Sequence, residues 1–282
     1  MTTDTMTHPA YPVLRFGNLE VRLATTLAEV DAAQALRYKV FYEEMGAQPT
    51  DEMLARKRDF DRYDEHCQHL LIIDHKLENS PIVGTYRMIR RCAAEKCGGF
   101  YSSTEYDISA IVEYPGELLE LGRSCIAADY RTGAVMQILW RGIAAFIVAY
   151  DVKLLFGCAS FQGTDVEKLT LPLSYLYHHH LAPPALRARA LPGRYVDMCR
   201  LPREAFDPNT AFDKLKFDPR GGSQSLPPLI KGYIRVGCAV GDGAVIDEQF
   251  NTTDIFIVVK TDLIADRYTK HYDLERKTPT AE

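Results

Sequence analysis

Apolar residues recur along this chain with the two-residue period of strands in some segments and with the helical period in others. Two apolar runs, residues 68–74 and 82–90, are separated by a polar turn around 76–81 and predict an antiparallel hairpin. Residues 19–24 alternate and predict a strand before the hairpin, while residues 117–126 predict a strand after it.

Helices are expected between these strands. Thr26 and Glu29 have the spacing of a capping box and predict a helix that continues to about Met45. Residues 132–151 begin with a Thr-Gly pair and predict a strongly apolar helix, and residues 166–177 predict a third.

The order of these elements predicts a mixed α/β fold, with antiparallel strands first and a strand–helix–strand crossover after them. We therefore expect one mixed central sheet flanked by helices. The other expected segments are loops at 48–64 and 93–113 (the second with a short helix), strands at 152–158, 195–200 and 254–260, a linker at 208–228 and a helix at 229–240. The chain is expected to divide into a flexible tail (residues 1–18), a core (19–200) and a C-terminal extension packed on that core (201–282).

Composition narrows the class of protein. The chain has 282 residues, of which 46% are hydrophobic and 25% charged, as in ordinary soluble globular proteins. Its formal net charge of −5 provides no basic field, so we expect no nucleic-acid partner. Seven cysteines without a Cys-x-x-Cys motif argue against a disulfide framework or zinc ribbon and predict a cytoplasmic protein. We find no signal peptide and no apolar run long enough to span a membrane.

Glu120 is the most anomalous charge, because it interrupts the run Leu-Leu-Glu-Leu within a predicted strand. Burial would raise its pKa and make it a better general base near neutral pH. The alternative is a structural ion pair with an arginine. Strand alternation predicts that Glu120 and Gly122 share one face, whereas Leu121 and Arg123 share the other with Leu119.

Two further groups of charges lie beside apolar or aromatic residues. Arg37 and Phe41 stand four apart on the first helix, where Arg37 is either functional or an arginine at the core edge. Asp61 and Asp64 need a cation between them, such as Arg37, Arg87 or an ammonium substrate, unless they form a surface cluster.

Two other motifs are read in the same way. Residues Arg131, Thr132 and Gly133 precede a helix, and free N–H groups at a helix start suit a phosphate. His69 and Asp74 are spaced as in glycerolipid acyltransferases, but their odd offset within a strand sends the two side chains to opposite faces. We therefore expect no His–Asp couple there.

Taken together, these motifs resemble the GNAT-related acyltransferases that use acyl carrier protein. The resemblance is strongest to the ornithine N-acylating group and weaker to acyl-homoserine-lactone synthases, and it covers roughly residues 20–200. The phosphate loop of acetyl-CoA enzymes is absent, and residues 131–135 are only a partial analogue, which favours a donor held by a carrier protein. The matching residues are Arg37, Phe41, Asp61, Asp64, Arg87, Glu120 and Arg123.

The resemblance implies transfer of a 3-hydroxyacyl chain from acyl carrier protein to the α-amine of L-ornithine, giving lyso-ornithine lipid. It implies Glu120 as base, the other matching residues as the substrate site, and Arg131, Thr132 and Gly133 as the site for the carrier's 4′-phosphopantetheine. No bound cofactor or metal is implied. Another amino acid or S-adenosylmethionine as acceptor, and a non-catalytic module, stay open.

Two surfaces are implied for partners. The acidic carrier protein would dock on basic residues at 87–91 together with Arg131, Arg141, Lys153 and Lys168. The basic stretch 186–194 is a candidate for loose contact with the inner face of the cytoplasmic membrane, the alternative being a solvent-exposed loop.

Overall fold

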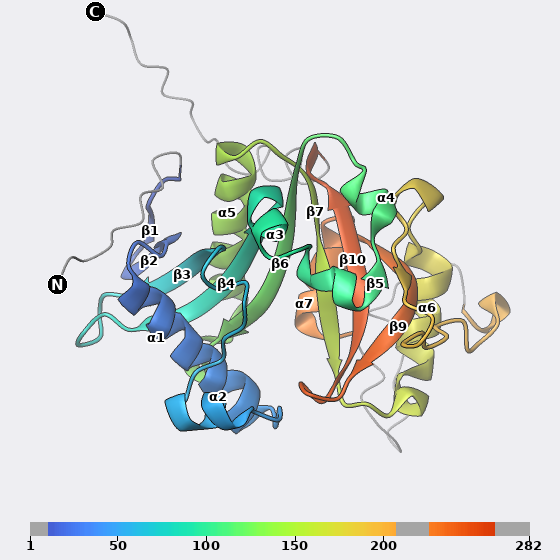
Figure 1. Cartoon of the computed structure of the whole chain (residues 1–282), viewed down its shortest axis with the longest axis horizontal. Helices are drawn as coiled ribbons and strands as arrows, with labels where there is room; N and C mark the ends of the chain where they lie inside the picture. Colours follow the sequence, from blue (N-terminus) through green and yellow to red (C-terminus); the bar gives the residue numbers. More distant parts are fainter. Residues whose placement is uncertain (1–10, 207–225, 263–282) are drawn as a thin grey trace, which may run out of the picture.

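A computed structural model of the chain describes residues 11–206 and 226–262, which form a single mixed sheet covered by helices on both faces (Figure 1). The strands are ordered β1-β2-β3-β4-β6-β7-β10-β9-β8-β5. Their bounds are β1 (Leu14–Phe16), β2 (Leu19–Leu23), β3 (Gln68–Asp74), β4 (Ile82–Arg90), β5 (Tyr106–Asp107), β6 (Glu117–Ile126), β7 (Val152–Gln162), β8 (Arg189–Ala190), β9 (Ala239–Asp247) and β10 (Thr252–Lys260).

The helices divide between the two faces of the sheet. One face is covered by α1 (Leu27–Tyr38), α3 (Arg91–Lys96), the 3₁₀ turn η2 (Tyr101–Thr104) and α4 (Ser109–Val112). The other is covered by α5 (Gly133–Ala149), α6 (Thr170–His180) and α7 (Pro228–Arg235), which pack into the largest apolar cluster. Within the described chain, no helix combines the length and the apolar character that a membrane span requires.

The central strands confirm the sequence pattern. Strands β3, β4 and β6 have the predicted bounds, and β3 is buried at six of its seven positions because helices cover both of its faces. The α1 cap also forms, since the Thr26 side chain accepts a hydrogen bond from the Glu29 backbone N–H at 3.2 Å. Helix α5 follows its predicted apolar stripe, which includes Leu139, Ile143 and Phe146.

The first helix departs from the expected uniform α-helix. It changes at Lys39 into a π-helical segment, η1 (Lys39–Glu44), which carries Phe41 and Tyr42 toward the site. The expected loop at 48–64 contains a short helix, α2 (Asp51–Arg56). Both segments belong to the neighbourhood of the site described below.

The ends of the chain differ more from expectation. Leu14–Phe16 pairs with β2, so the segment expected to be a flexible tail contains a strand, and its residues 1–10 lie outside the described residues. The helix expected at 229–240 ends at Arg235, and β9 follows it. Residues 195–200 contribute only an isolated bridge between Val196 and Ala244. Most of the linker expected at 208–228 lies outside the described residues.

The C-terminal part completes the sheet and does not lie upon it. Strand β10 pairs with β7 along its whole length, from Thr252 opposite Gln162 to Lys260 opposite Leu154. Residues near 255 therefore occupy the middle of the sheet, and a boundary at residue 200 does not separate two packing units.

Candidate active site

The site lies where β6 and β7 separate, which are the one parallel pair of long strands among the described residues. Strands β6 and β7 pair from Glu117 opposite Val152 to Glu120 opposite Phe156, and the described pairing ends there. Beyond Glu120 the two strands diverge around a cavity of about 890 Å³. Residues of β6, β7, η1, α5, α7 and β10 line this cavity, so both halves of the chain build it.

Glu120 lies at the apex of this opening and is fully buried. Its Oε2 accepts the Tyr101 backbone N–H at 2.7 Å, and its Oε1 accepts the Ser102 N–H at 2.7 Å and also the Ser102 hydroxyl. Burial raises the pKa of Glu120, and these hydrogen bonds oppose the rise. The carboxylate is therefore held rigidly at the cavity wall, and no arginine forms a direct ion pair with it among the described residues.

A bulge in β6 places Arg123 on the same side of the sheet as Glu120, contrary to the simple alternation expected above. Arg123 has φ 52°, and the register between β4 and β6 shifts beside it. Its guanidinium lies 4.9 Å from the centre of the Tyr101 ring and 4.5 Å from that of Phe250. The bulge thus turns this guanidinium into the cavity.

Arg37 is the centre of a buried ionic cluster. Its Nε donates to Asp59 Oδ2 at 2.6 Å, and its two terminal nitrogens contact Asp64 at 2.7 and 3.0 Å. Arg37 is 0% exposed, which makes it a fully buried partner of two carboxylates and not a residue of the core edge.

Two more arginines join this cluster from the sheet. Arg87 Nη1 donates to Asp61 Oδ1 at 2.6 Å, and Arg123 lies 3.3 Å from both Asp59 and Asp61. Three guanidiniums thus face three carboxylates. We define the arginine–aspartate cluster as Arg37, Arg87, Arg123, Asp59, Asp61 and Asp64.

The pairing explains the protonation states in this cluster. The Asp64 and Asp59 side chains are buried, which by itself would raise their pKa values. The Arg37 guanidinium outweighs that effect and holds both pKa values below their ordinary range. Asp59 was not singled out from the sequence, because Arg58-Asp59 reads as an ordinary surface pair.

Phe41 contributes an aromatic wall to the cavity. Its ring packs edge-on against Phe250, with ring centres 5.7 Å apart, so η1 meets the β9–β10 turn there. His69 and Asp74 do not couple, as expected: His69 Nε2 lies 3.0 Å from the Asp64 carbonyl oxygen, while Asp74 accepts from Asn18 at 2.9 Å.

The residues expected to hold phosphopantetheine lie at another edge of the same cavity. Arg131, Thr132 and Gly133 all line it at the start of α5. Thr132 caps the helix by accepting from the Val135 N–H at 3.3 Å. Arg131 donates to the Ile126 carbonyl at 3.0 Å and pairs with Glu44.

A second group of charges, which the sequence did not reveal, lies where β9 and β10 border the cavity. The carboxylates of Glu105, Asp247 and Asp254 approach one another within 4.8 Å, and all three are buried. We call these residues the acidic cluster. Burial raises the pKa values of Glu105 and Asp254, and their mutual proximity adds to the rise for Glu105. Three such oxygens could hold a cation.

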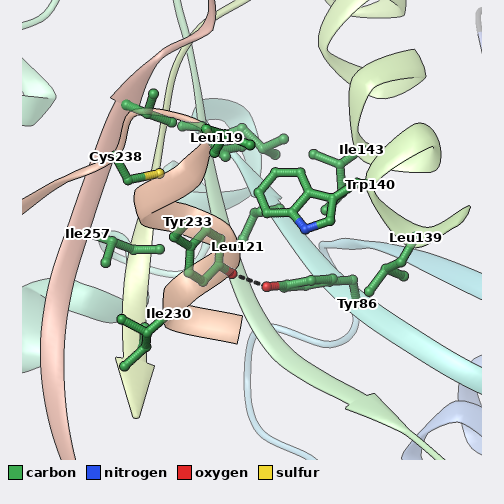
Figure 2. Close-up of a cluster of buried hydrophobic side chains, with 14 of the residues drawn as sticks. Tyr86, Leu119, Leu121, Leu139, Trp140, Ile143, Ile230, Tyr233, Cys238 and Ile257 are labelled. Atoms are coloured by element: carbon green, nitrogen blue, oxygen red, sulfur yellow. Dashed lines mark hydrogen bonds between the residues drawn. The ribbon is translucent and has the colours of Figure 1, made fainter. Parts of the chain in front are cut away.

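The end of the cavity between α5 and α7 is apolar. Trp140 of α5 packs edge-on against Tyr233 of α7, with ring centres 5.4 Å apart. Figure 2 shows the Tyr233 hydroxyl meeting the hydroxyl of Tyr86 from β4, which ties α7 to the sheet. Met136, Leu229 and Val236 extend this apolar lining.

One expected partner surface needs correction. Arg87 is 1% exposed and lies within the arginine–aspartate cluster, so it is not available for docking a carrier protein. In the basic stretch 186–194, Arg189 is exposed while Leu186, Ala188 and Ala190 are buried, and its contact with a membrane stays a prediction.

Comparisons with known proteins agree with this geometry. The family model described as the acetyltransferase (GNAT) domain matches residues 36–141. Two solved structures are similar to this chain at low identity and low TM-score. These are the CoA-dependent acyl-homoserine lactone synthase BjaI (14% identity, 86% of this chain, 82% of that chain, TM-score 0.46) and a putative N-acetyltransferase from Lactobacillus plantarum (12% identity, 86% and 99%, TM-score 0.42).

Sequence relatives are much more similar. An L-ornithine N(alpha)-acyltransferase of Brucella abortus (strain 2308) is 44% identical over 93% of this chain and 91% of its own length. Proteins of the same name from Rhizobium meliloti (strain 1021) and Rhodobacter capsulatus are 44% and 38% identical, over 94% and 90% of this chain and 88% and 94% of their own lengths. The chain is therefore a GNAT-fold N-acyltransferase and belongs to the L-ornithine N(alpha)-acyltransferase family.

Proposed function

We propose that this enzyme transfers a 3-hydroxyacyl chain from acyl carrier protein to the α-amine of L-ornithine and so forms lyso-ornithine lipid. The main support for this proposal is the cavity where β6 and β7 separate. Glu120 lies at its apex, charged residues line one end, and the end between α5 and α7 is apolar. A polar amine and a fatty chain would meet beside Glu120. The names of the relatives supply ornithine as the acceptor.

Glu120 is the proposed base. The bound acceptor arrives as an ammonium, and Glu120 accepts one of its protons directly or through water, which frees the nitrogen lone pair. The nitrogen attacks the thioester carbonyl, the new C–N bond forms, and the C–S bond breaks to release the thiolate of the carrier. That thiolate takes the second proton from the new amide nitrogen. Backbone N–H groups of β6 beyond Glu120, which no longer pair with β7, are proposed to stabilise the oxyanion.

The arginine–aspartate cluster would shape the acceptor site. Arg87 and Arg123 line the cavity, where their guanidiniums suit the carboxylate of an amino acid. Asp59 and Asp64 instead use their oxygens on Arg37 and so hold the arginines in place. Asp61 would act in the same way through Arg87.

The donor would enter at the start of α5. A single phosphate of phosphopantetheine would lie at this 17-residue helix's first turn, near Arg131, Thr132 and Gly133. The 3-hydroxyacyl chain would then extend into the apolar end beside Trp140 and Tyr233. No bound cofactor is proposed, because the carrier brings its own prosthetic group. The enzyme would work in the cytoplasm, with at most loose contact with the inner face of the membrane.

A thiol-release assay tests this proposal. Purified protein is mixed with 3-hydroxyacyl carrier protein or the matching acyl-CoA and with L-ornithine, glycine, L-glutamine or S-adenosylmethionine, and products are identified by mass spectrometry. Ornithine-dependent release with carrier protein, giving N-acyl-ornithine, is the expected result. Release only with another acceptor would replace ornithine in the proposal, and release only with acyl-CoA would replace acyl carrier protein as donor. No release from folded protein would refute catalysis.

A further inference from the structure

One carboxylate oxygen of the acidic cluster has no hydrogen-bond donor in the described part of the chain, and its residue, Asp254, lines the cavity. Asp254 is 6% exposed, and the neighbouring Thr252 and Ser160 side chains lower the pKa of its carboxyl. Its Oδ1 is nevertheless buried and accepts no hydrogen bond from the residues that the structure describes. Asp254 and Asp247 both line the cavity. A buried carboxylate oxygen without a donor costs free energy, so this position favours an incoming donor.

The other members of the cluster are already occupied in part. Asp247 Oδ1 accepts the Phe250 backbone N–H at 3.0 Å. Glu105 Oε2 accepts from the Cys158 thiol at 3.3 Å, and the Arg194 guanidinium lies 3.6 Å from Glu105 Oε1. Arg194 thus faces the cluster from the far side. From the cavity side, the charge of Arg123 lowers the pKa of Asp254, but Arg123 is shared with Asp59 and Asp61. The three carboxylates therefore have no guanidinium of their own on the cavity side among the described residues.

The cluster lies close to the proposed base along one wall. Ser102 donates its hydroxyl to Glu120 and lies 3.5 Å from the Cys158 sulfur, which in turn contacts Glu105. Two side chains therefore separate Glu120 from the acidic cluster. Glu120, Asp247 and Asp254 also line the same cavity, so one acceptor molecule can contact both groups.

We infer that Asp254, supported by Asp247 and Glu105, binds the side-chain ammonium of the acceptor amino acid. This inference rests on the proposed function and names the part of the site that selects a cationic acceptor. An ammonium offers three donors and one positive charge, which match a free oxygen among partly occupied carboxylates. Its binding would supply the donor that Asp254 lacks and offset the repulsion within the cluster.

The experiment compares L-ornithine with L-norvaline, which has the same carbon skeleton without the terminal amine. Steady-state kinetics with 3-hydroxyacyl carrier protein are measured for the wild type, Asp254→Asn and Asp247→Asn. Binding of both amino acids is measured by calorimetry without donor. Asp151→Asn is the matched control, because Asp151 is exposed and lies before β7, away from the cavity.

The expected result is selective. Asp254→Asn should weaken ornithine binding and raise its KM about 10- to 100-fold, while norvaline is unaffected. Asp247→Asn should act in the same direction, and Asp151→Asn should change nothing. Since asparagine has the size of aspartate and removes a buried charge, circular dichroism should show an intact fold for Asp254→Asn.

Other outcomes overturn the inference in distinguishable ways. If the wild type acylates ornithine but Asp254→Asn keeps its preference over norvaline, the proposed function stands and this subsite does not. If the wild type transfers no acyl group to ornithine and calorimetry detects no ornithine binding, both fail. If Mg²⁺, Ca²⁺ or Mn²⁺ binds to the wild type but not to Asp254→Asn, and chelation abolishes transfer, the cluster is a metal site instead.

Discussion

Two buried clusters of carboxylates lie beside the cavity, and they differ in how their charge is balanced. In the arginine–aspartate cluster, three guanidiniums meet three carboxylates at distances down to 2.6 Å. In the acidic cluster, three carboxylates gather within 4.8 Å, and among the described residues only Arg194 lies at ion-pair distance from one of them, 3.6 Å from Glu105. The carboxylates of the first cluster are therefore paired without a ligand, whereas those of the second are not.

The pKa values express the same difference. Arg37 lowers the pKa values of Asp59 and Asp64 despite their burial. Burial raises the pKa values of Glu105 and Asp254. The charge of Arg194 at Glu105, and that of Arg123 together with the Thr252 and Ser160 side chains at Asp254, lower these pKa values but do not outweigh burial. Burial of a carboxylate therefore does not by itself identify a binding residue. We assign Asp254 a binding role because it is buried and no arginine among the described residues is paired to it.

Loss of Arg37 should have the largest effect on stability. Arg37→Met would leave Asp59 and Asp64 buried without their main partner, and we expect a loss of about 3–5 kcal/mol in the free energy of unfolding. Urea denaturation followed by circular dichroism measures this loss. Arg58→Met is the matched control, because it breaks a partly exposed pair with Asp31 and should cost about 1 kcal/mol or less. Equal losses in the two variants would contradict the importance of the cluster.

Replacement of Glu120, which lies between the two clusters, should mainly affect turnover. Glu120→Gln cannot accept the ammonium proton, and we expect kcat to fall about 10²- to 10⁴-fold with the fold retained. Glu117→Gln is the control, since Glu117 belongs to the same strand and pairs with Arg90 outside the cavity. Full activity of Glu120→Gln would remove Glu120 from the role of base.

The two clusters should respond to pH in opposite directions. The folded pKa of Asp64 is lowered, so its contribution to stability is present above its unfolded pKa and is lost as pH falls. The folded pKa of Asp254 is raised, so its ionisation destabilises the fold as pH rises from about 4 toward 7. Asp254→Asn should therefore unfold less readily than the wild type at pH 7 to 8, by about 1–2 kcal/mol.

The pH measurement needs both variants. Asp64→Asn should be less stable than the wild type at pH 7 and approach it in strong acid, because the wild-type advantage depends on the ionised carboxylate. Thermal unfolding at several pH values without acceptor gives both comparisons. A destabilised Asp254→Asn at pH 8 would show that the acidic cluster is already neutralised within the protein.

Cys158 should have the smallest effect, although it touches both Ser102 and Glu105. A thiol is a weak hydrogen-bond donor, so Cys158→Ala should change stability by about 1 kcal/mol and kcat only a few-fold. The same kinetic assay and urea titration measure this variant. A loss of activity as large as that of Glu120→Gln would indicate that Cys158 participates in proton transfer.

Local signals in the sequence determined much of the sheet and its helices. The strands β3, β4 and β6 were predicted with correct bounds, because central strands covered on both faces produce continuous apolar runs. The helix predicted at 229–240 was partly wrong. Residues 236–240 of this segment are all uncharged and mostly apolar, and such a run does not distinguish a buried helix from a strand.

The sequence also identified unusual charges but not their partners. It singled out Glu120, Arg37 and Arg87, since charges in apolar context need compensation. Strand alternation predicted that Arg123 lies on the face opposite to Glu120, which is wrong because a bulge in β6 reverses the alternation. The sequence did not reveal Asp59, which looks like half of a surface pair until Arg37 meets it across 22 residues.

The acidic cluster shows what only the tertiary structure decided. Glu105 follows a 3₁₀ turn, Asp247 ends β9 and Asp254 lies on β10, so no spacing in the sequence connects them. Periodicity and capping depend on neighbours along the chain and are therefore readable from sequence. Burial and counter-charge depend on contacts between distant segments, and these determine which carboxylates are balanced and which remain open to a substrate.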